Sequence, residues 1–427
     1  MGLLRKSEIK KFFLSFLLAA LPFERALAGG YAITPQTAKA ASLANAATAG
    51  IDDPSAIYFN PAALTEVEGG QIMGGLDYVN VLSGVSNSGR ESKNNHDDNF
   101  IPTLFGSYHV PKTDLTAGIG LYTPFGLSTS YEGDSFTRFA SVQSKLRTLY
   151  ITPGLAWRPF PYLSLGGGVS FVHSSAVLSQ ALFLGGPEGR LRITGADDAY
   201  AYNLGILVKP INSIKVGLTY RSRVDLNFNN ADAKFADAAI TGGAVTLAHA
   251  KGVHVPLPPV ISTGINWKIT PAWAVEFVYD YTRWSEFKSL SAEFSPLLPA
   301  LGGFVPIPGF VTPENWKNTS TLRFGTSYKI NPSIELRAGL GLDETPIPSN
   351  TLSPGIPGAD WMTLTGGIGY NWRNFGVDLG YMAVFYKTRT VTNNVMEGGN
   401  PLNPVAPGPD KYRTFQNLVL LTLRYRF

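Results

Sequence analysis

The stretch LVLLTLRYRF, residues 418–427, has the two-residue alternation of a β-strand. One face carries Val419, Leu421, Leu423, Tyr425 and Phe427, and the other carries Thr422, Arg424 and Arg426. In a water-soluble sandwich the apolar face would lie in the core and the arginines would face water. In a membrane barrel the apolar face would meet lipid and the arginines would face a polar lumen. A single strand is compatible with both arrangements, so the rest of the chain has to separate them.

The same alternation recurs elsewhere in the 427 residues, in runs that begin at Trp273, Leu322, Ile334 and Phe375. Several runs are longer than the roughly 5–6 residues usual for a soluble strand and suit a tilted membrane crossing of about 9–11 residues. We count about fourteen runs, an even number, which places both ends of the sheet on one rim, where they can pair. The alternation therefore favours a closed barrel.

The connections between these runs are short on one side and long on the other. Tight turns fall at 111–114, 159–162, 209–213, 268–271, 330–333 and 372–375. Long segments fall near 84–98, 125–143, 175–195, 228–256, 287–316, 344–360 and 387–412. This asymmetry is typical of an outer-membrane barrel. The sequence predicts an all-β membrane protein, an antiparallel outer-membrane β-barrel of about fourteen strands with a small N-terminal helical hatch in its lumen.

The tryptophans follow the same division. Trp157, Trp267, Trp273 and Trp372 border short turns, and Trp284, Trp316 and Trp361 border long connections. This placement predicts two aromatic girdles, one at each membrane interface. Tryptophans scattered through a core are the alternative.

The first 28 residues have the pattern of an export signal. A charged region with Arg5, Lys6, Lys10 and Lys11 precedes an apolar run at 12–23 and an A-x-A site at 26–28. The apolar run is well short of the ~20 residues that a membrane anchor needs. We expect a signal peptide at 1–28, a hatch at 29–65 and a transmembrane barrel at 66–427, in the outer membrane of a Gram-negative cell.

The width of the barrel predicts a hatch. A fourteen-strand barrel is too wide for its own side chains to fill, so an unfilled lumen would be a water-filled pore. Thr34-Pro35, Asp53-Pro54 and Asn60-Pro61 each pair an N-cap residue with proline at the first helical position, and Gly50 would end the first helix. Such short helices are marginal in water and need surrounding walls. A disordered N-terminal tail is the alternative.

Several blocks of the sequence resemble one known family. DPSAIYFNPAAL (53–64), LYTPFGLSTSY (121–131), GLTYRS (217–222), RWSEF (283–287) and LRAGLGLDETPIP (336–348) occur in the order found in the FadL-type outer-membrane long-chain fatty-acid and hydrocarbon transporters. The resemblance implies passive uptake of hydrophobic compounds, most of all long-chain fatty acids. It also implies a hatch marked by Asn60, Pro61 and Ala62. Tyr425 and Phe427 would form the signal read by the barrel-assembly machinery.

The family also has a lateral opening at a kink in the third strand. Here the third run, Leu115–Leu121, is followed by Thr123, Pro124, Phe125 and Gly126. Proline removes a donor from the strand ladder and glycine weakens a strand, so pairing is expected to break at this point. An ordinary strand end is the alternative. A side exit would let a hydrophobic solute enter lipid without crossing water.

Two long connections, 235–260 and 291–313, are unusually apolar for exposed loops. Packing between loops would explain them, and so would a groove that captures apolar cargo. Our candidates for that groove are Phe235, Leu247, Phe294, Leu297, Leu298, Leu301, Phe304 and Phe310.

A fatty-acid carboxylate would need a basic partner. The resemblance points to Lys317, which could equally be a solvated lysine at the rim. The family's second basic residue has no counterpart after the fifth strand, where Ser179 and Gln180 stand, and PGADW (357–361) departs from the family pattern at Trp361. Hydrocarbons therefore remain open as cargo.

Other classes of function have little support. The chain has no cysteine, a net charge of +4 and 15% charged residues, which excludes a disulfide framework and disfavours a nucleic-acid partner. No catalytic or metal-binding motif accompanies its five histidines. We expect no enzyme activity, cofactor or metal, and a monomer whose partners are hydrophobic small molecules and outer-membrane lipid. A general diffusion porin is the remaining rival, but it would need an open channel with a charged constriction.

Overall fold

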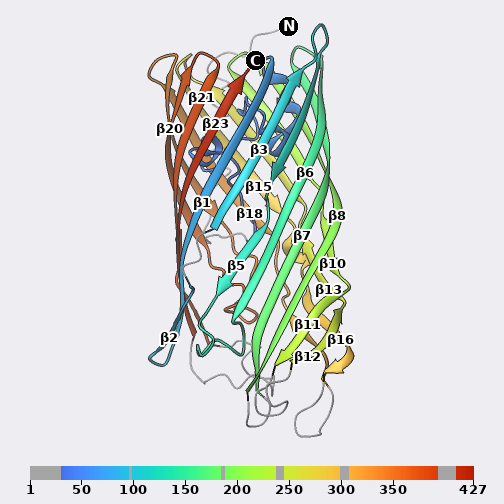
Figure 1. The fold of residues 1–427 in the computed structure, drawn as a ribbon. Coiled ribbons are helices and arrows are strands. Elements are labelled where there is room, and N and C mark those ends of the chain that lie inside the picture. Colours follow the sequence, from blue (N-terminus) through green and yellow to red (C-terminus); the bar gives the residue numbers. More distant parts are fainter. Residues whose placement is uncertain (1–29, 96–98, 184–187, 237–244, 299–306, 393–409) are drawn as a thin grey trace.

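Fourteen antiparallel strands form the wall of a barrel in the computed structural model, which describes residues 30–95, 99–183, 188–236, 245–298, 307–392 and 410–427 (Figure 1). The predicted signal peptide lies outside these residues. The wall strands are β1 (Gly70–Asn87), β3 (Asn99–His109), β4 (Leu115–Tyr122), β6 (Gln143–Phe160), β7 (Leu163–Phe183), β8 (Glu188–Ile211), β9 (Ile214–Arg221), β14 (Val260–Lys268), β15 (Trp273–Thr282), β18 (Thr319–Lys329), β19 (Ile334–Asp343), β20 (Trp361–Trp372), β21 (Phe375–Tyr386) and β23 (Asp410–Arg426). Each strand pairs with its neighbours in the chain order, as short hairpin turns require.

The barrel closes where the last strand meets the first. β23 pairs with β1 from Gln71↔Arg426 to Ser86↔Lys411, and it pairs with β21 along its other edge. The predicted strand count and the predicted pairing of the two ends are both confirmed.

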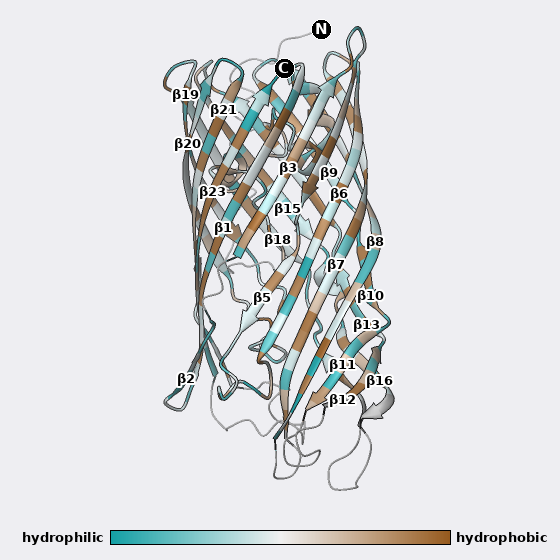
Figure 2. Ribbon diagram, in the orientation of Figure 1, coloured by the Kyte–Doolittle hydropathy of each residue, from teal (hydrophilic) through white to brown (hydrophobic). Residues whose placement is uncertain are grey.

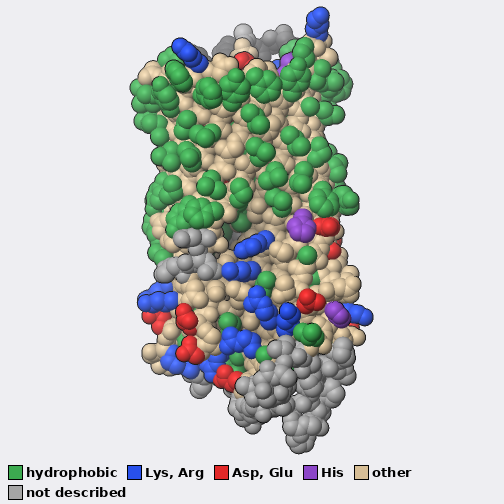
Figure 3. Space-filling view, viewed as in Figure 1, with side chains coloured by type: hydrophobic (Ala, Val, Ile, Leu, Met, Phe, Trp, Pro, Cys, Tyr) green, Lys and Arg blue, Asp and Glu red, His purple; other side chains and the backbone are tan. Residues whose placement is uncertain are grey.

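Alternate residues of the wall strands face lipid and lumen. On β23 the exposed side chains include Leu423 (54% exposed) and Tyr425, whereas Arg424 (7% exposed) and Thr422 are buried inside. The outward apolar side chains make a band over the half of the barrel that carries the short turns, and most of the Lys, Arg, Asp and Glu side chains in this view lie on the other half (Figures 2 and 3). Lipid is therefore the solvent of this band.

The two ends of the barrel differ as predicted. Short turns join the strands at one end, where the C-terminus also lies (Figure 1). The other end carries β2 (Arg90–Lys93), β10 (Val224–Phe228), β11 (Ala231–Ala236), β12 (Val245–Lys251), β13 (Val253–Leu257), η2 (Trp284–Glu286), β16 (Ser289–Leu298), β17 (Ile307–Pro313) and β22 (Arg389–Val391). By the rule for outer-membrane barrels, this end is extracellular.

Only one of the two predicted tryptophan girdles is present. Trp157, Trp267, Trp273 and Trp372 are exposed beside the short turns. At the other end Trp284 and Trp316 are 1% and 2% exposed, so they lie inside the protein, and the assignment of these two to an outer girdle is wrong. The side chain of Trp361 also turns inward, where its indole N–H donates to Asp343. Sequence spacing places these residues near a loop but does not give the face they occupy.

The N-terminal segment (residues 30–67) contains three short helices, α2 (Ala38–Ala41), α3 (Ala56–Phe59) and η1 (Pro61–Glu66). None of the helices in the described ranges could span a bilayer. The helices begin later than predicted at two places, because Thr37 and not Thr34 caps α2, and α3 follows Ser55. The first helix ends at Ala41 rather than at Gly50. The predicted cap at Asn60 with Pro61 in the first turn is confirmed.

The segment packs against inward-facing glycines of the wall. A Cβ atom at Gly205 of β8 would collide with the Asn60 side chain, and one at Gly166 of β7 would collide with the backbone of Pro61 and Ala62. Glycine at these positions lets the backbone of the segment lie directly on the sheet. The segment therefore lies inside the barrel, in contact with its inner face.

Candidate functional site

The third wall strand stops pairing with its neighbour partway along the barrel. β3 pairs with β1 as far as Asn99↔Val79, but its pairing with β4 ends at Leu104↔Leu121. The next strand, β5 (Gly126–Ser130), pairs with β6. In the described part of the wall, residues 99–103 thus have a strand partner along one edge only.

The four residues Thr123–Gly126 bend inward and bond to the N-terminal segment. The Ile33 N–H donates to the Pro124 carbonyl at 2.8 Å, and the Gly126 N–H donates to the Tyr31 carbonyl at 2.9 Å. The Gln36 side chain accepts from the Thr123 N–H at 3.1 Å and donates to the Thr123 carbonyl at 3.0 Å. Backbone groups that a regular strand would offer to β3 are therefore satisfied by residues 31–36.

A cavity of about 680 Å³ occupies the break. It is lined by both faces of β3, since Ile101 lies on the side of the buried Thr103 and Phe100 (59% exposed) points outward. It is also lined by both faces of β6, through the buried Leu146 and the outward-facing Leu149. A cavity with inner and outer residues of the same strands on its surface passes through the wall. We call this cavity the wall opening, and Figure 3 shows a hollow in the same face of the barrel.

Most of the lining is apolar or uncharged. Val79, Val81 and Pro102 line one side, Leu127 lines the other, and Met382 and Tyr386 lie at the inner end. Among the described residues that line the opening, Arg147 is the only charged one.

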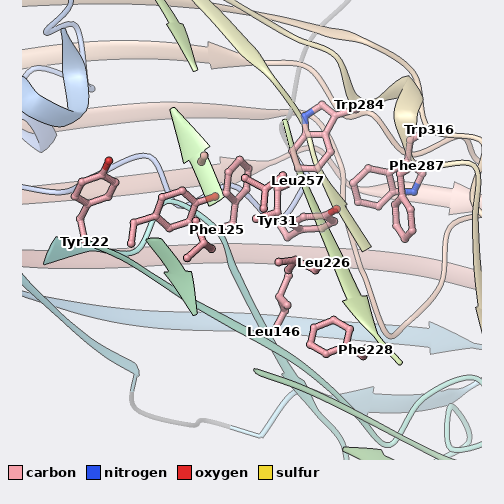
Figure 4. Close-up of a cluster of buried hydrophobic side chains, with 14 of the residues drawn as sticks. Tyr31, Tyr122, Phe125, Leu146, Leu226, Phe228, Leu257, Trp284, Phe287 and Trp316 are labelled. Atoms are coloured by element: carbon pink, nitrogen blue, oxygen red, sulfur yellow. The ribbon is translucent and has the colours of Figure 1, made fainter. Parts of the chain in front are cut away.

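An aromatic cluster borders the opening on the lumen side (Figure 4). Tyr31 lies at its centre, with its ring centroid 4.8 Å from that of Trp284 and 5.4 Å from that of Trp316. The Tyr31 ring also meets the edge of Phe125 at 6.3 Å, and its hydroxyl donates to the Pro256 carbonyl at 2.6 Å. Tyr31 thus joins the kink to the interior of the extracellular half.

Glu314 is buried at the edge of this cluster. Its carboxylate accepts from the Trp316 indole N–H at 2.8 Å, and its carbonyl accepts from the Thr351 hydroxyl at 2.7 Å. Burial raises the pKa of Glu314 to about 7, against the opposing effect of the Trp316 hydrogen bond. The cluster therefore contains one group that titrates near neutral pH.

Inward charges hold the N-terminal segment in place. Glu66, at the end of η1, binds Lys215 at 2.8 Å and Lys209 at 2.5 Å, and it also pairs with Arg158. On the opposite side, Arg323 donates to the Ala44 carbonyl at 3.2 Å while it pairs with wall carboxylates. These contacts tie the segment to the wall at Glu66 and at Ala44.

The residues of the predicted hatch motif contact both the rest of the segment and the wall. The Asn60 amide donates to the Thr48 carbonyl at 2.8 Å and to the Ile206 carbonyl of β8 at 3.2 Å, and its oxygen accepts from the Ala62 N–H. Pro61 and Ala62 are buried against β7 and β8.

The predicted capture residues divide into three groups. Phe235 and Phe294 are buried in one apolar cluster, and the ring of Phe310 lies 6.3 Å from that of Phe294. Leu247 is 64% exposed on the outer face of β12, away from those three. Leu301 and Phe304 lie outside the described residues, as do the side chains of Leu297 and Leu298 in β16. Lys317 is exposed, and its backbone N–H donates to the Pro346 carbonyl.

Tyr425 and Phe427 lie at the end of β23, among the outward aromatic side chains of the short-turn rim. Their rings stack at 6.4 Å, and the Phe427 N–H donates to the Gly70 carbonyl at 2.9 Å.

Tyr31, Gln36 and Arg147 were not among the residues that sequence reasoning selected. Residues 31–36 and 123–126 are almost ninety positions apart (|i−j| = 87 for Gln36 and Thr123), and nothing in either stretch indicates that they bond to each other. For Arg147 a signal did exist, because it is a charge on the outward face of an alternating run.

Residues 19–427 match the family described as "Outer membrane protein transport protein (OMPP1/FadL/TodX)". The chain belongs to this family. The FadL resemblance expected from the sequence is thereby confirmed, and the chain is an outer-membrane protein of a family that transports hydrophobic compounds.

Relatives of the FadL/TodX family match most of the chain. The 47 kDa outer membrane protein of Pasteurella multocida is 25% identical, over 94% of this chain and 97% of its own. The long-chain fatty acid transport protein of Escherichia coli K12 is 24% identical, over 77% and 81%.

Solved structures of the same family share the fold. A FadL homologue of Pseudomonas aeruginosa has a TM-score of 0.79 at 19% identity, covering 93% of this chain and 100% of the other. The toluene transporter TodX of P. putida has a TM-score of 0.72 at 19% identity, covering 94% and 99%. At this identity the likeness concerns the fold alone.

Proposed function

We propose that this protein takes up hydrophobic compounds passively across the outer membrane and releases them sideways into the membrane through the wall opening. The observation that carries the proposal is the cavity between β3 and β5, whose lining includes both inner and outer residues of the wall. Membership of the FadL/TodX family supports the same role.

The proposed path starts in the apolar interior of the extracellular half. Phe235, Phe294 and Phe310 would bind cargo first, and the cluster around Tyr31 would connect this region to the opening. Cargo on this path exchanges one apolar surface for another, and release into lipid avoids the cost of exposing it to periplasmic water. No energy source is needed, because the cargo moves down its own gradient.

In this proposal residues 29–65 act as a hatch that keeps the lumen closed to ions, while the kink at Thr123–Gly126 holds the wall open. Residues 1–28 would be the export signal, and Tyr425 with Phe427 would be read by the barrel-assembly machinery. The charged contacts of Glu66 and Arg323 support a fixed hatch, because they tie the segment to the wall.

Long-chain fatty acids are the cargo we propose first, since a relative that matches most of the chain is a long-chain fatty acid transport protein. Hydrocarbons are the second candidate. They are favoured by the lining of the opening, where one residue alone among those described is charged. A general diffusion porin has less support, because the N-terminal segment packs against the inner wall where a porin keeps its channel.

The experiment uses the absence of cysteine from the chain. Ser128 of β5 lines the opening, so a Ser128→Cys variant can be blocked with a bulky, reducible thiol reagent. We expect labelling to lower uptake of a fatty acid or a hydrocarbon at least about tenfold in whole cells, because the label fills the only side exit we propose. Reduction of the label should restore uptake.

Ala196→Cys is the matched control, because Ala196 is exposed on the outer face of β8 and does not line the opening. Labelling there should leave uptake unchanged. Full uptake by the labelled Ser128→Cys variant would contradict release through the wall.

A further inference from the structure

We propose that Arg147 is a specificity-determining residue of the wall opening, which guides the carboxylate of an acidic cargo as it leaves the barrel. This inference rests on the proposed function and names a residue that distinguishes acids from neutral hydrocarbons. Arg147 is separate from the expected carboxylate partner Lys317, which lies between β17 and β18.

The first observation is the isolation of this charge. Every other described residue that lines the opening is neutral. Among the described residues no ion pair or hydrogen bond occupies the Arg147 side chain. This differs from the inward arginines, of which Arg323 and Arg337 are each held by two carboxylates. An arginine without a carboxylate partner at the mouth of an apolar cavity is available to an anionic ligand.

The second observation is the position of Arg147 on the strand. It lies opposite Gly126 of β5, so no side chain of the paired residue stands between it and the opening. It points outward, as Leu149 and Ile151 do on the same strand. Each residue adds about 3.4 Å along a strand, so Arg147 stands about 7 Å beyond Leu149 on the extracellular side.

The neighbouring strands place the edge of the apolar band at the same level. Phe171 and Tyr200 form an outward aromatic pair, and the next outward pair along these strands is His173 with Asp198. Arg147 follows one step later, opposite Ser175. It is therefore at the level where the hydrocarbon region gives way to polar headgroups.

A cation at this place would stabilise the carboxylate of a departing acid. When an amphiphile leaves through the wall, its hydrocarbon tail can enter the lipid without a free-energy cost. Its carboxylate cannot, because a charge is costly to place in hydrocarbon. A guanidinium beside the exit binds the carboxylate in a charge-assisted pair and keeps it at the polar edge while the tail moves out. A neutral hydrocarbon has no group that needs this contact.

The test compares two cargoes with the same hydrocarbon chain, the acid oleate and the neutral oleyl alcohol, in cells carrying the full-length protein. Arg147→Gln removes the cation, and Arg147→Met removes it while keeping an apolar side chain of similar length. We expect either variant to lower the initial rate of oleate uptake about tenfold, the factor of one charge-assisted contact, and to leave oleyl alcohol unchanged. Arg147→Lys should retain most oleate uptake, because it keeps the charge.

Arg192→Gln is the matched control. Arg192 is another outward arginine on the extracellular side, but it binds Gln143 and does not line the opening. Its replacement should change the uptake of neither cargo. The heat-modified mobility of each variant in gels reports whether the barrel has assembled.

Four outcomes overturn the inference. Unchanged oleate uptake in Arg147→Gln would show that the charge is not used. An equal loss of both cargoes would assign Arg147 to the wall or to a lipid headgroup. Uptake of oleyl alcohol but not oleate by the wild-type chain would refute the inference and leave the proposed function intact, whereas uptake of neither would refute both.

Discussion

At the scale of single residues, one-position steps along a wall strand change the solvent from lipid to lumen. Leu423 and Arg424 are neighbours in sequence. Leu423 is half exposed on the outer face of the wall, whereas Arg424 is buried on its inner face. The guanidinium of Arg424 donates to the Asn371 side-chain oxygen at 2.7 Å. Many polar groups of the inner face bond to each other or to the N-terminal segment, and such bonds offset the cost of burying them.

Glu314 leads to a prediction about pH. Its pKa is raised to about 7 from the value of 4.5 of a solvated glutamate, because it is buried. The folded chain thus holds this proton where an unfolded chain has lost it, so the stabilisation is complete below pH 4.5 and is lost as the pH rises through about 7. We expect the contacts around Trp316 to weaken above pH 7 by an amount on the order of 1 to 3 kcal/mol.

Hydrogen exchange of residues 312–318 at pH 5 and pH 8, corrected for intrinsic rates, measures this effect. Glu314→Gln should remove the pH dependence, since the amide is neutral throughout. Equal protection at both pH values in the wild-type chain would mean that Glu314 does not control the cluster.

The face that a residue occupies can be predicted from the sequence where contact with lipid or with the polar lumen alone decides it. The two faces of residues 418–427 could be assigned because apolar and charged side chains separate cleanly. The positions of Trp284 and Trp316 could not be assigned, because tryptophan is favourable both at a membrane interface and in a buried aromatic cluster. The choice depends on Tyr31, which comes from the other end of the chain and meets both rings.

At the scale of elements, the N-terminal segment and the kinked strand form one unit. Thr123–Gly126 leave the wall, and residues 31–36 take over their backbone bonds. A displacement of the segment would therefore release the kink, and closure of the kink would release the segment. These bonds connect the N-terminal segment to the edge of the wall opening.

The anchoring of this unit gives a second prediction. Glu66→Gln leaves Lys209, Lys215 and Arg158 without their shared carboxylate. We expect the loss to destabilise the folded barrel by about 1–3 kcal/mol, less than a fully buried pair because Lys209 and Arg158 are partly exposed. Urea unfolding in lipid vesicles measures the change.

Glu68→Gln serves as the control, since Glu68 is exposed two residues further on and contributes a carbonyl but no ion pair among the described contacts. If both variants unfold at the same urea concentration as the wild type, the Glu66 cluster does not anchor the segment.

The elements themselves were predictable to different degrees. Wall strands could be located because each carries its own alternation and ends at a turn. The helices of the N-terminal segment could not be bounded, because their ends depend on contact with the wall. Asn60 is an exception, since its capping bond to Ala62 is local and visible in the sequence. The bonding of the kink to residues 31–36 is a long-range contact and has no local signal.

At the scale of the whole molecule, the N-terminal segment packs against the inner face of the barrel and the wall is open at its side. A porin has the opposite arrangement, with a continuous wall and an open axis. Cargo and ions should therefore take different routes through this protein. A hydrophobic solute can use the side, whereas an ion cannot enter the apolar band at a comparable rate.

The third prediction follows for conductance. The intact protein in a planar bilayer should show no large steady current, and deletion of residues 29–65 should produce one, because the lumen is then a water-filled pore. Gly205→Val tests the same idea without a deletion, since its side chain would collide with Asn60 and should cause intermittent current. A large steady current in the intact protein, or none after the deletion, would refute a hatch.

The pairing of β1 with β23 has a consequence for how the barrel is assembled. It joins positions about 350 residues apart, such as Gln71 and Arg426, so the cylinder cannot be sealed until nearly all of the polypeptide has been made and moved through the inner membrane. Until then the outward apolar faces of the strands and the unpaired strand edges would be exposed to water. We therefore expect that the unsealed chain needs a chaperone, and that closure of the barrel between β1 and β23, not formation of single strands, limits the rate at which the folded protein accumulates.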